Sequence, residues 1–203
     1  MESTPTVFIV DDDVSLLKSL RWLLEAAHFH VETYESAEHY LSAYDPSRPG
    51  CLVLDVRMPG MDGLELQKAL NFRSATIPTL FMTGHGDIAM AVKCLNEGAF
   101  DFIEKPYNDQ ELVQRIQAAL QKDGEIRRKL WHCSEAATRI AQLTAREREV
   151  MELLVTGSSN KQIATDLGIS EKTVAVHRSN MMDKLQASSV VDLIQLAAAS
   201  KAS

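Results

Sequence analysis

Five polar side chains in the first half of the chain each follow a short apolar stretch, and together they could carry out phosphoryl transfer. They are three carboxylates, a hydroxyl and an amine: Asp11, Asp12, Asp55, Thr83 and Lys105. Short apolar runs that alternate with helical stretches are typical of buried parallel strands. Ligands of open parallel sheets bind beyond the carboxyl ends of the strands. We therefore expect these side chains to converge at one edge of a sheet.

A carboxylate is a competent nucleophile toward phosphorus, and the transferred group needs cations and hydrogen bonds around its oxygens. Asp55 is the candidate nucleophile, Lys105 could pair with a phosphoryl oxygen, and Thr83 could donate a hydrogen bond. Mg²⁺ suits such a site because it needs only one or two carboxylates, which Asp11 and Asp12 could supply.

Each of these residues also has an ordinary structural explanation. The acidic run from Asp11 to Asp13 could cap a helix. Thr83 could be a turn residue, and Lys105 a surface lysine. The position of every one of them at the end of its own strand favours a shared site.

The elements that would position these residues alternate between strand and helix patterns. Strands are expected at residues 6–10, 31–34, 51–54, 79–82 and 100–103, and helices at 15–27, 37–43, 64–72, 88–97 and 110–121. Five such units joined by right-handed crossovers make an α/β fold with a doubly wound parallel sheet.

The second half of the chain contains only helical patterns. Charged residues compatible with a helix fill positions 122–142, which we interpret as a helical linker, either separate or continuous with the helix expected at 110–121. Thr144 and Glu147 have the spacing of a capping box at the start of the next helix. A short helix at 161–167, a turn at Gly168 and a longer helix to about residue 185 form a helix-turn-helix pattern, followed by a last helix at 190–199.

The second helix of such a motif can enter the major groove of DNA, where its exposed face would meet phosphates and base edges. The candidate contacts are Lys161, Lys172, Thr173, Val176, His177, Asn180 and Lys184. Val174, Met181 and Leu185 lie on the opposite face and are expected to pack inward. A plain helical bundle with a solvated charged surface is the alternative.

Composition is consistent with two modest domains in the 203 residues. The chain has 21 Lys and Arg against 28 Asp and Glu, but from Arg139 onward eight basic residues stand against seven acidic ones. Only this back part could present a basic face. The three cysteines follow no metal-binding or disulfide pattern, and we see neither a signal peptide nor a membrane span, so we expect a cytoplasmic protein with reduced thiols.

Residues 4–121 resemble a response-regulator receiver domain of two-component signalling. The resemblance lies in Ile-Val-Asp-Asp-Asp, Leu-Asp-Val-Arg-Met-Pro-Gly-Met-Asp-Gly, Met-Thr-Gly-His-Gly and Glu-Lys-Pro, in that order. It implies a five-stranded sheet of order 2-1-3-4-5 and phosphorylation of Asp55 by a sensor histidine kinase.

The same resemblance implies roles for the neighbouring residues. Asp11 and Asp12 would hold Mg²⁺ together with Asp55 and the backbone carbonyl of Arg57, and Lys105 would contact the phosphoryl group. The Lys105–Pro106 bond would be cis. Thr83 and Phe102 match the pair that moves when such domains are phosphorylated, although Phe102 could equally be a plain core aromatic residue.

Residues 143–203 resemble the four-helix DNA-binding domain of the LuxR type. The matching stretches are Leu-Thr-Ala-Arg-Glu-Arg-Glu-Val, Asn-Lys-Gln-Ile-Ala and Ile-Ser-Glu-Lys-Thr-Val-Ala-Val-His-Arg-Ser-Asn. Two positions that face bases in that family are Ala175 and Ser179 here. The two resemblances together indicate a transcription regulator of the FixJ/NarL type. Its expected partners are a histidine kinase, promoter DNA and a second copy of the phosphorylated chain. RNA polymerase is a further possible partner, and no interaction with a membrane is expected.

Two rival functions remain. A Mg²⁺-dependent phosphohydrolase also uses an aspartate nucleophile on a doubly wound sheet, but such enzymes usually carry a second acid two residues later, where this chain has Arg57. A regulator whose receiver only dimerises, without phosphorylation, is disfavoured because the acidic edge is complete. We therefore expect a phosphorylation-switched DNA-binding protein and not an enzyme.

Overall fold

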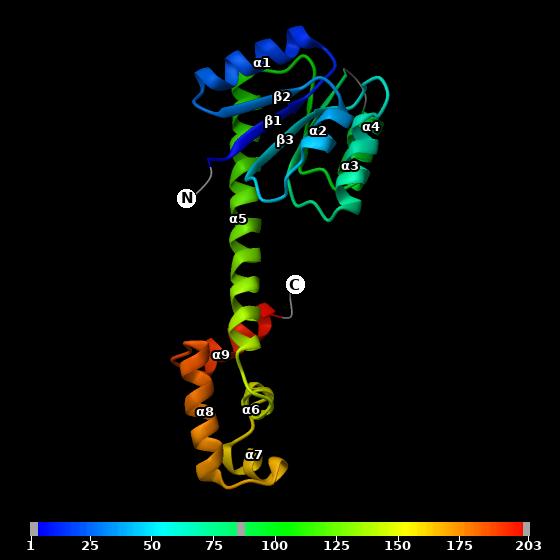
Figure 1. The fold of residues 1–203 in the computed structure, drawn as a ribbon. Coiled ribbons are helices and arrows are strands. Elements are labelled where there is room, and N and C mark those ends of the chain that lie inside the picture. The colour runs from blue at the N-terminus through cyan, green and yellow to red at the C-terminus, as the bar shows by residue number, and fades with distance from the viewer. Residues whose placement is uncertain (1–3, 85–87, 201–203) are drawn as a thin grey trace. The chain divides into compact units, whose positions relative to one another are not determined.

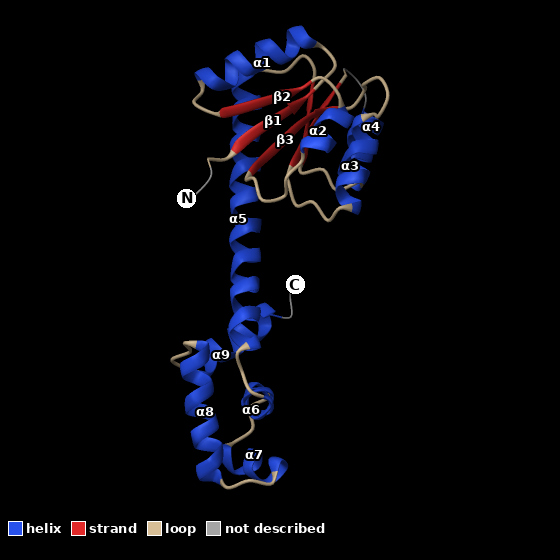
Figure 2. Cartoon of the chain, viewed as in Figure 1, coloured by secondary structure: helices blue, strands red, loops and turns tan. Residues whose placement is uncertain are grey.

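The computed structural model describes residues 4–84 and 88–200, so the His-Gly of the Met-Thr-Gly-His-Gly motif lies outside the described residues. The chain forms two compact units, Met1–Arg127 and Arg128–Ser203. The first contains the sheet and the second is helical (Figures 1 and 2).

The sheet of the first unit has five parallel strands in the order β2-β1-β3-β4-β5, as predicted. The strands are β1 (Thr6–Val10), β2 (His30–Tyr34), β3 (Gly50–Asp55), β4 (Thr79–Thr83) and β5 (Asp101–Glu104). β3 and β4 each run one residue further than expected, because Asp55 pairs with Met82 and Thr83 pairs with Glu104. Two of the candidate site residues are therefore the last residues of their strands.

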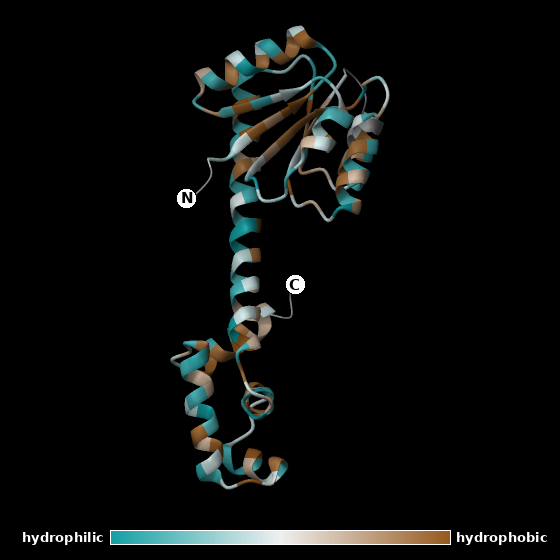
Figure 3. Ribbon diagram, in the orientation of Figure 1, coloured by the Kyte–Doolittle hydropathy of each residue, from teal (hydrophilic) through white to brown (hydrophobic). Residues whose placement is uncertain are grey.

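Helices cover both faces of this sheet (Figure 1). They are α1 (Val14–Ala26), α2 (Ala37–Ala43), α3 (Gly63–Phe72), α4 (Ile88–Asn96) and α5 (Asp109–Ala141). Side chains alternate along each strand, so Val7 and Ile9 pack with α1 and α5, whereas Phe8 and Val10 pack with α2, α3 and α4. Hydrophobic residues make up most of the central strands β1 and β3 (Figure 3).

The N-terminus of α1 decides between the two interpretations of the acidic run. Asp13 is the capping residue, and its carboxylate accepts hydrogen bonds from the backbone N–H groups of Ser15 and Leu16. Asp11 instead accepts one from the N–H of Asp13, 2.8 Å away. Asp13 is therefore the cap of α1, and Asp11 takes no part in capping it.

α5 continues without a break to Ala141, so the expected helical linker is an extension of the fifth helix. Asp123 is 2% exposed although it lies in the charged stretch, and it accepts a hydrogen bond from the N–H of Gly50 at 2.9 Å. Arg127 pairs with Asp123 at 2.8 Å and also donates to the backbone carbonyls of Pro46, Ser47 and Arg48. The stretch from residue 122 to 127 is thereby attached to the loop before β3.

The second unit contains α6 (Ala145–Val155), α7 (Asn160–Leu167), α8 (Glu171–Leu185) and α9 (Val190–Ser200). The predicted capping box at the start of α6 is present. α7 ends at Gly168, whose φ of 66° turns the chain toward α8, and the Ser170 side chain caps α8. Val174, Met181 and Leu185 are fully buried, as predicted, so α7 and α8 form a helix-turn-helix with one face of α8 outward.

Cys51, Cys94 and Cys133 are buried and form no disulfide. Within the described ranges, no helix combines the length and apolar composition that crossing a membrane requires.

Candidate functional site

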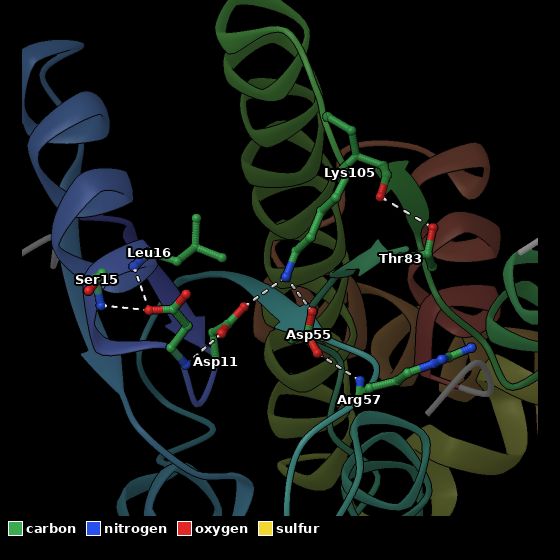
Figure 4. A network of polar contacts seen from close by, with 9 residues as sticks. Asp11, Ser15, Leu16, Asp55, Arg57, Thr83 and Lys105 are labelled. Carbon is green, nitrogen blue, oxygen red and sulfur yellow. Dashed lines mark hydrogen bonds and ion pairs between the residues drawn. The ribbon is translucent and has the colours of Figure 1, made fainter. Parts of the chain in front are cut away.

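The carboxyl edge of the sheet brings two of the predicted carboxylates and the lysine into direct contact. The Lys105 ammonium lies 3.0 Å from Asp11 Oδ2 and 2.5 Å from Asp55 Oδ1 (Figure 4). Asp11 follows β1, Asp55 ends β3, and Lys105 follows β5. The strand order makes this possible, since β1 and β3 are neighbours and the long lysine side chain reaches past β4.

Two hydrogen bonds to backbone groups also orient this cluster, one accepted by Asp55 and one donated by the backbone of Lys105. The second carboxylate oxygen of Asp55 accepts a hydrogen bond from the N–H of Arg57 at 2.7 Å, while the Arg57 side chain points away from Asp55 (Figure 4). The N–H of Lys105 donates to the carbonyl of Thr83 at 2.8 Å. Gly63 allows α3 to begin beside Asp55, because a Cβ at this position would lie 2.3 Å from the Asp55 carbonyl oxygen.

The ionisation of the cluster reflects its burial. Burial raises the pKa of Asp55 above its ordinary value, although the hydrogen bond from Lys105 opposes this. Burial also disfavours the charged form of Lys105, but its hydrogen bonds to Asp55 and Asp11 outweigh that effect and raise the pKa of the amine. The ammonium is therefore kept charged next to a carboxylate that ionises less readily than usual.

Thr83 and Phe102 occupy adjacent strands beside this cluster. Thr83 is buried, and its hydroxyl donates to the carbonyl of Ile103 at 3.5 Å. Phe102 is half-buried on β5, opposite Phe81, and packs against the core on the α2–α4 side of the sheet. The core role of Phe102 and a role in a switch are both compatible with this placement.

The residues present fit Mg²⁺, as judged from their donor chemistry. Asp11 and Asp55 already share one cation, the Lys105 ammonium, so their oxygens converge on positive charge. Asp12 is exposed beside them. Among the described residues, no three His, Cys, Asp or Glu side chains gather closely enough to hold a metal ion by themselves. Mg²⁺ does not require three, because it retains several water ligands.

The outer face of α8 presents most of the predicted DNA contacts. Those exposed on it are Lys172, Thr173, Ala175, Val176, Ser179 and Asn180, with Lys161 exposed on α7. His177 is partly buried. Lys184 differs from the expectation of a side chain directed to phosphate, because its ammonium lies 2.7 Å from Glu147 Oε2 on α6. The flexible Lys184 side chain lies at the edge of this face and can reach either a DNA phosphate or Glu147. Helical spacing does not distinguish these two directions.

Sequence reasoning missed the polar residues that fasten α5 and α8. Asp123 lies at helical spacing from Leu112, Ile116 and Ala119, which are all fully buried. The periodicity of the sequence therefore predicts that Asp123 lies on the inner face of α5. For Arg139, which donates to the carbonyl of Leu185 at 3.2 Å, the sequence carries no comparable signal.

The fold and the site define a response regulator, in which a receiver domain controls an output domain. Residues 7–117 match the family model "Response regulator receiver domain", and residues 141–197 match "Bacterial regulatory proteins, luxR family". The chain belongs to the FixJ/NarL-type response regulators. It is therefore a transcriptional regulator of a two-component system and not an enzyme.

Several transcriptional and response regulators are similar to this chain over most of its length. FixJ of Azorhizobium caulinodans is 46% identical over 97% of this chain and 92% of its own length. TodT of Pseudomonas putida is 42% identical over 94% of this chain and 84% of its own. A solved structure of the response regulator StyR is 45% identical with a TM-score of 0.86, and the alignment covers 97% of this chain and 99% of that one. Full-length FixJ from B. japonicum is 39% identical with a TM-score of 0.60, covering 99% of each chain.

Proposed function

We propose that Asp55 accepts a phosphoryl group from a sensor histidine kinase and that this reaction switches DNA binding. The observation that carries the proposal is the Lys105 ammonium between Asp11 and Asp55 at the carboxyl edge of the sheet. A buried carboxylate with a fixed cation beside it can attack phosphorus and has a counter-charge ready for the transferred group.

In this mechanism one carboxylate oxygen of Asp55 forms a bond to phosphorus while the bond between phosphorus and the kinase histidine breaks. Asp11, Asp12, Asp55 and the backbone carbonyl of Arg57 would hold Mg²⁺, which supplies positive charge to the phosphoryl oxygens when bound. Lys105 would leave Asp55 for a phosphoryl oxygen, and the Thr83 hydroxyl would donate to another. Asp55 must be ionised to react, and burial raises its pKa. As the pH is lowered, phosphorylation should therefore be lost at a higher pH than for a carboxylate with an ordinary pKa.

Asp12→Ala tests the metal assignment. Asp12 is exposed and Asp13 caps α1, so the substitution is expected to weaken Mg²⁺ binding without destabilising the fold. Titration calorimetry measures the affinity, with Asp45→Ala as the control for the loss of one exposed acidic residue. Equal Mg²⁺ affinity in Asp12→Ala and the unaltered protein would contradict the assignment.

Phosphorylation would act through Thr83 and Phe102. Movement of Thr83 toward the phosphoryl group would let Phe102 pack further inward and reshape the surface of α4 and β5. Val92 and Leu95 on α4 are 51% and 43% exposed, an apolar surface that a second copy could cover. On α9, Val191 and Ile194 are similarly exposed and could contribute. A dimer joins two DNA-binding helices, which raises affinity for paired half-sites without new base contacts.

Sedimentation velocity on the full chain tests this proposal. Acetyl phosphate and Mg²⁺ are expected to convert monomer to dimer, and the unphosphorylated chain should remain monomeric at the same concentration. Val92→Glu would place charge in the contact and is expected to reduce dimer formation while phosphate uptake, read by intact mass, stays complete. A phosphorylated chain that remains monomeric where it occupies DNA would exclude dimerisation as the switch.

The exposed face of α8 would read promoter DNA, with Lys161 and Lys172 toward phosphates and Thr173, Ala175, Val176, His177, Ser179 and Asn180 toward the groove. Lys172→Ala is expected to lower the slope of log affinity against log salt concentration by about one, because one phosphate contact is lost. Val176→Ala should instead alter preference among sequences, since an apolar contact to a thymine methyl carries base information. Binding to random and to selected duplexes over a range of salt concentrations measures both, and an affinity independent of salt would contradict the assignment.

We further propose that the receiver module extends to Arg127, beyond the boundary of 121 that its motifs indicate. The DNA-binding module would then begin within the former linker, at about residue 128.

A chromosomal target would place this function in the bacterial cytoplasm, and contact with RNA polymerase would follow if the regulator activates transcription.

A further inference from the structure

Two cations hold the C-terminal end of α8. Lys184, in the last turn of α8, donates to Glu147 Oε2 at 2.7 Å. Arg139, in the last turn of α5, donates from Nη1 to the backbone carbonyl of Leu185, the last residue of α8, at 3.2 Å. Neither partner belongs to the outer face of α8. The two contacts therefore act on the position of the helix and not on the surface that it presents.

Glu147 is a fixed partner. Its side chain is only 5% exposed, and the same oxygen that meets Lys184 also accepts the N–H of Thr144 at 2.8 Å. The hydrogen bond from Lys184 is the main reason that the pKa of Glu147 is lowered, and the amide of Thr144 adds to it. A carboxylate held by the start of α6 thus anchors the end of α8.

Arg139 satisfies a carbonyl that the helix itself cannot. The last carbonyl groups of a helix lack intrahelical donors, and a cation there also interacts favourably with the helix dipole. The chain leaves α8 through Gln186, whose φ of 53° turns it away. Glu135, one turn earlier on α5, pairs with Arg139 Nη2 at 2.6 Å and so directs the guanidinium toward Leu185.

We propose that Arg139, Glu135, Lys184 and Glu147 are positioning residues for DNA recognition and that neither cation contacts phosphate. This inference rests on the proposed reading of DNA by α8. The helix has 15 residues and is therefore about 22 Å long, so a tilt of about 5° at its C-terminal end moves its first turn by about 2 Å. A displacement of that size breaks hydrogen bonds between side chains and bases.

Substitution of the acidic residues Glu135 and Glu147 tests the proposal, because a positioning role and a purely electrostatic effect change the affinity for DNA in opposite directions. Glu135→Gln and Glu147→Gln each remove a negative charge, and electrostatics alone would make the protein bind DNA more tightly. If the residues position α8, both substitutions weaken specific binding instead. Arg139→Gln should also weaken it, whereas Lys129→Gln removes an exposed positive charge from the same helix and serves as the matched control.

The experiment uses the full chain and a duplex selected by the unaltered protein from a random-sequence pool. We expect each of the three positioning variants to lose about twofold to thirtyfold in affinity for the selected duplex. Their log–log salt slopes should stay unchanged, and their affinity for random duplex should fall much less. Circular dichroism at the assay temperature verifies that each variant is folded. Glu135 is on the surface, so Glu135→Gln keeps the test valid if Glu147→Gln is poorly folded.

The outcomes distinguish loss of the positioning role from loss of DNA recognition by α8. Equal or tighter binding by the acid-to-amide variants, or a slope lowered by about one in Arg139→Gln, would overturn the positioning role while Lys172→Ala and Val176→Ala still respond. If Lys172→Ala and Val176→Ala have no effect on binding, α8 does not read DNA, and both the proposed function and the positioning role are overturned.

Discussion

Asp55→Asn is expected to abolish phosphate uptake from acetyl phosphate. The amide keeps the shape of the side chain but lacks the negative charge that makes the carboxylate a nucleophile. Intact-mass spectrometry after incubation with acetyl phosphate and Mg²⁺ should show one added phosphate on the unaltered chain and none on the variant. Asp45→Asn, which changes an exposed acid in the loop before β3, is the matched control and should be phosphorylated normally.

Unfolding would not account for this loss. Because burial raises the folded-state pKa of Asp55, the folded chain holds this proton more tightly than the unfolded chain does, and the stability linked to protonation is present at low pH and is lost as the pH rises through the folded pKa. At neutral pH the ionised carboxylate therefore opposes folding, and replacing it with an amide should leave the variant folded. Phosphate on Asp55→Asn at the level of the unaltered chain would show that another residue is the acceptor.

Arg127→Ala is expected to cause a large loss of stability in the first unit. Asp123 is almost fully buried, and without Arg127 its carboxylate loses its cation and retains the hydrogen bond from the N–H of Gly50. Breaking such a pair leaves a buried charge uncompensated and costs about 3 kcal/mol. For a unit of this size the unfolding midpoint should fall by roughly 10 °C. Scanning calorimetry of the full chain measures the transition of the first unit.

Arg128→Ala, an exposed neighbour on the same helix, is the control and should leave the midpoint almost unchanged. A double-mutant cycle with Asp123→Ala should show strong coupling, because the second substitution removes the charge that the first leaves unpaired. Little loss in Arg127→Ala would mean that residues 122–127 are not part of the receiver fold, and the boundary near residue 121 would stand.

The sequence alone determined the fold class and the members of the site. Apolar runs of strand length predicted all five strands, and the polar residues that follow them include Asp11, Asp55 and Lys105, which meet in the structure. Local chemistry also predicted the Thr144–Glu147 capping box. These features could be predicted because each depends either on residues a few positions apart or on the general rule that the carboxyl ends of parallel strands lie at the same edge of a sheet.

Only the tertiary structure distinguished residues that look alike in the sequence. Among three consecutive aspartates it made Asp13 the cap, buried Asp11 against Lys105 and left Asp12 exposed. It also directed Lys184 to Glu147, 37 residues away in sequence. Long flexible side chains choose between solvent and a distant partner according to where the backbone places that partner, and no local pattern contains this distance. The groups available for chemistry could therefore be predicted from the sequence, whereas packing determined which of them are in contact.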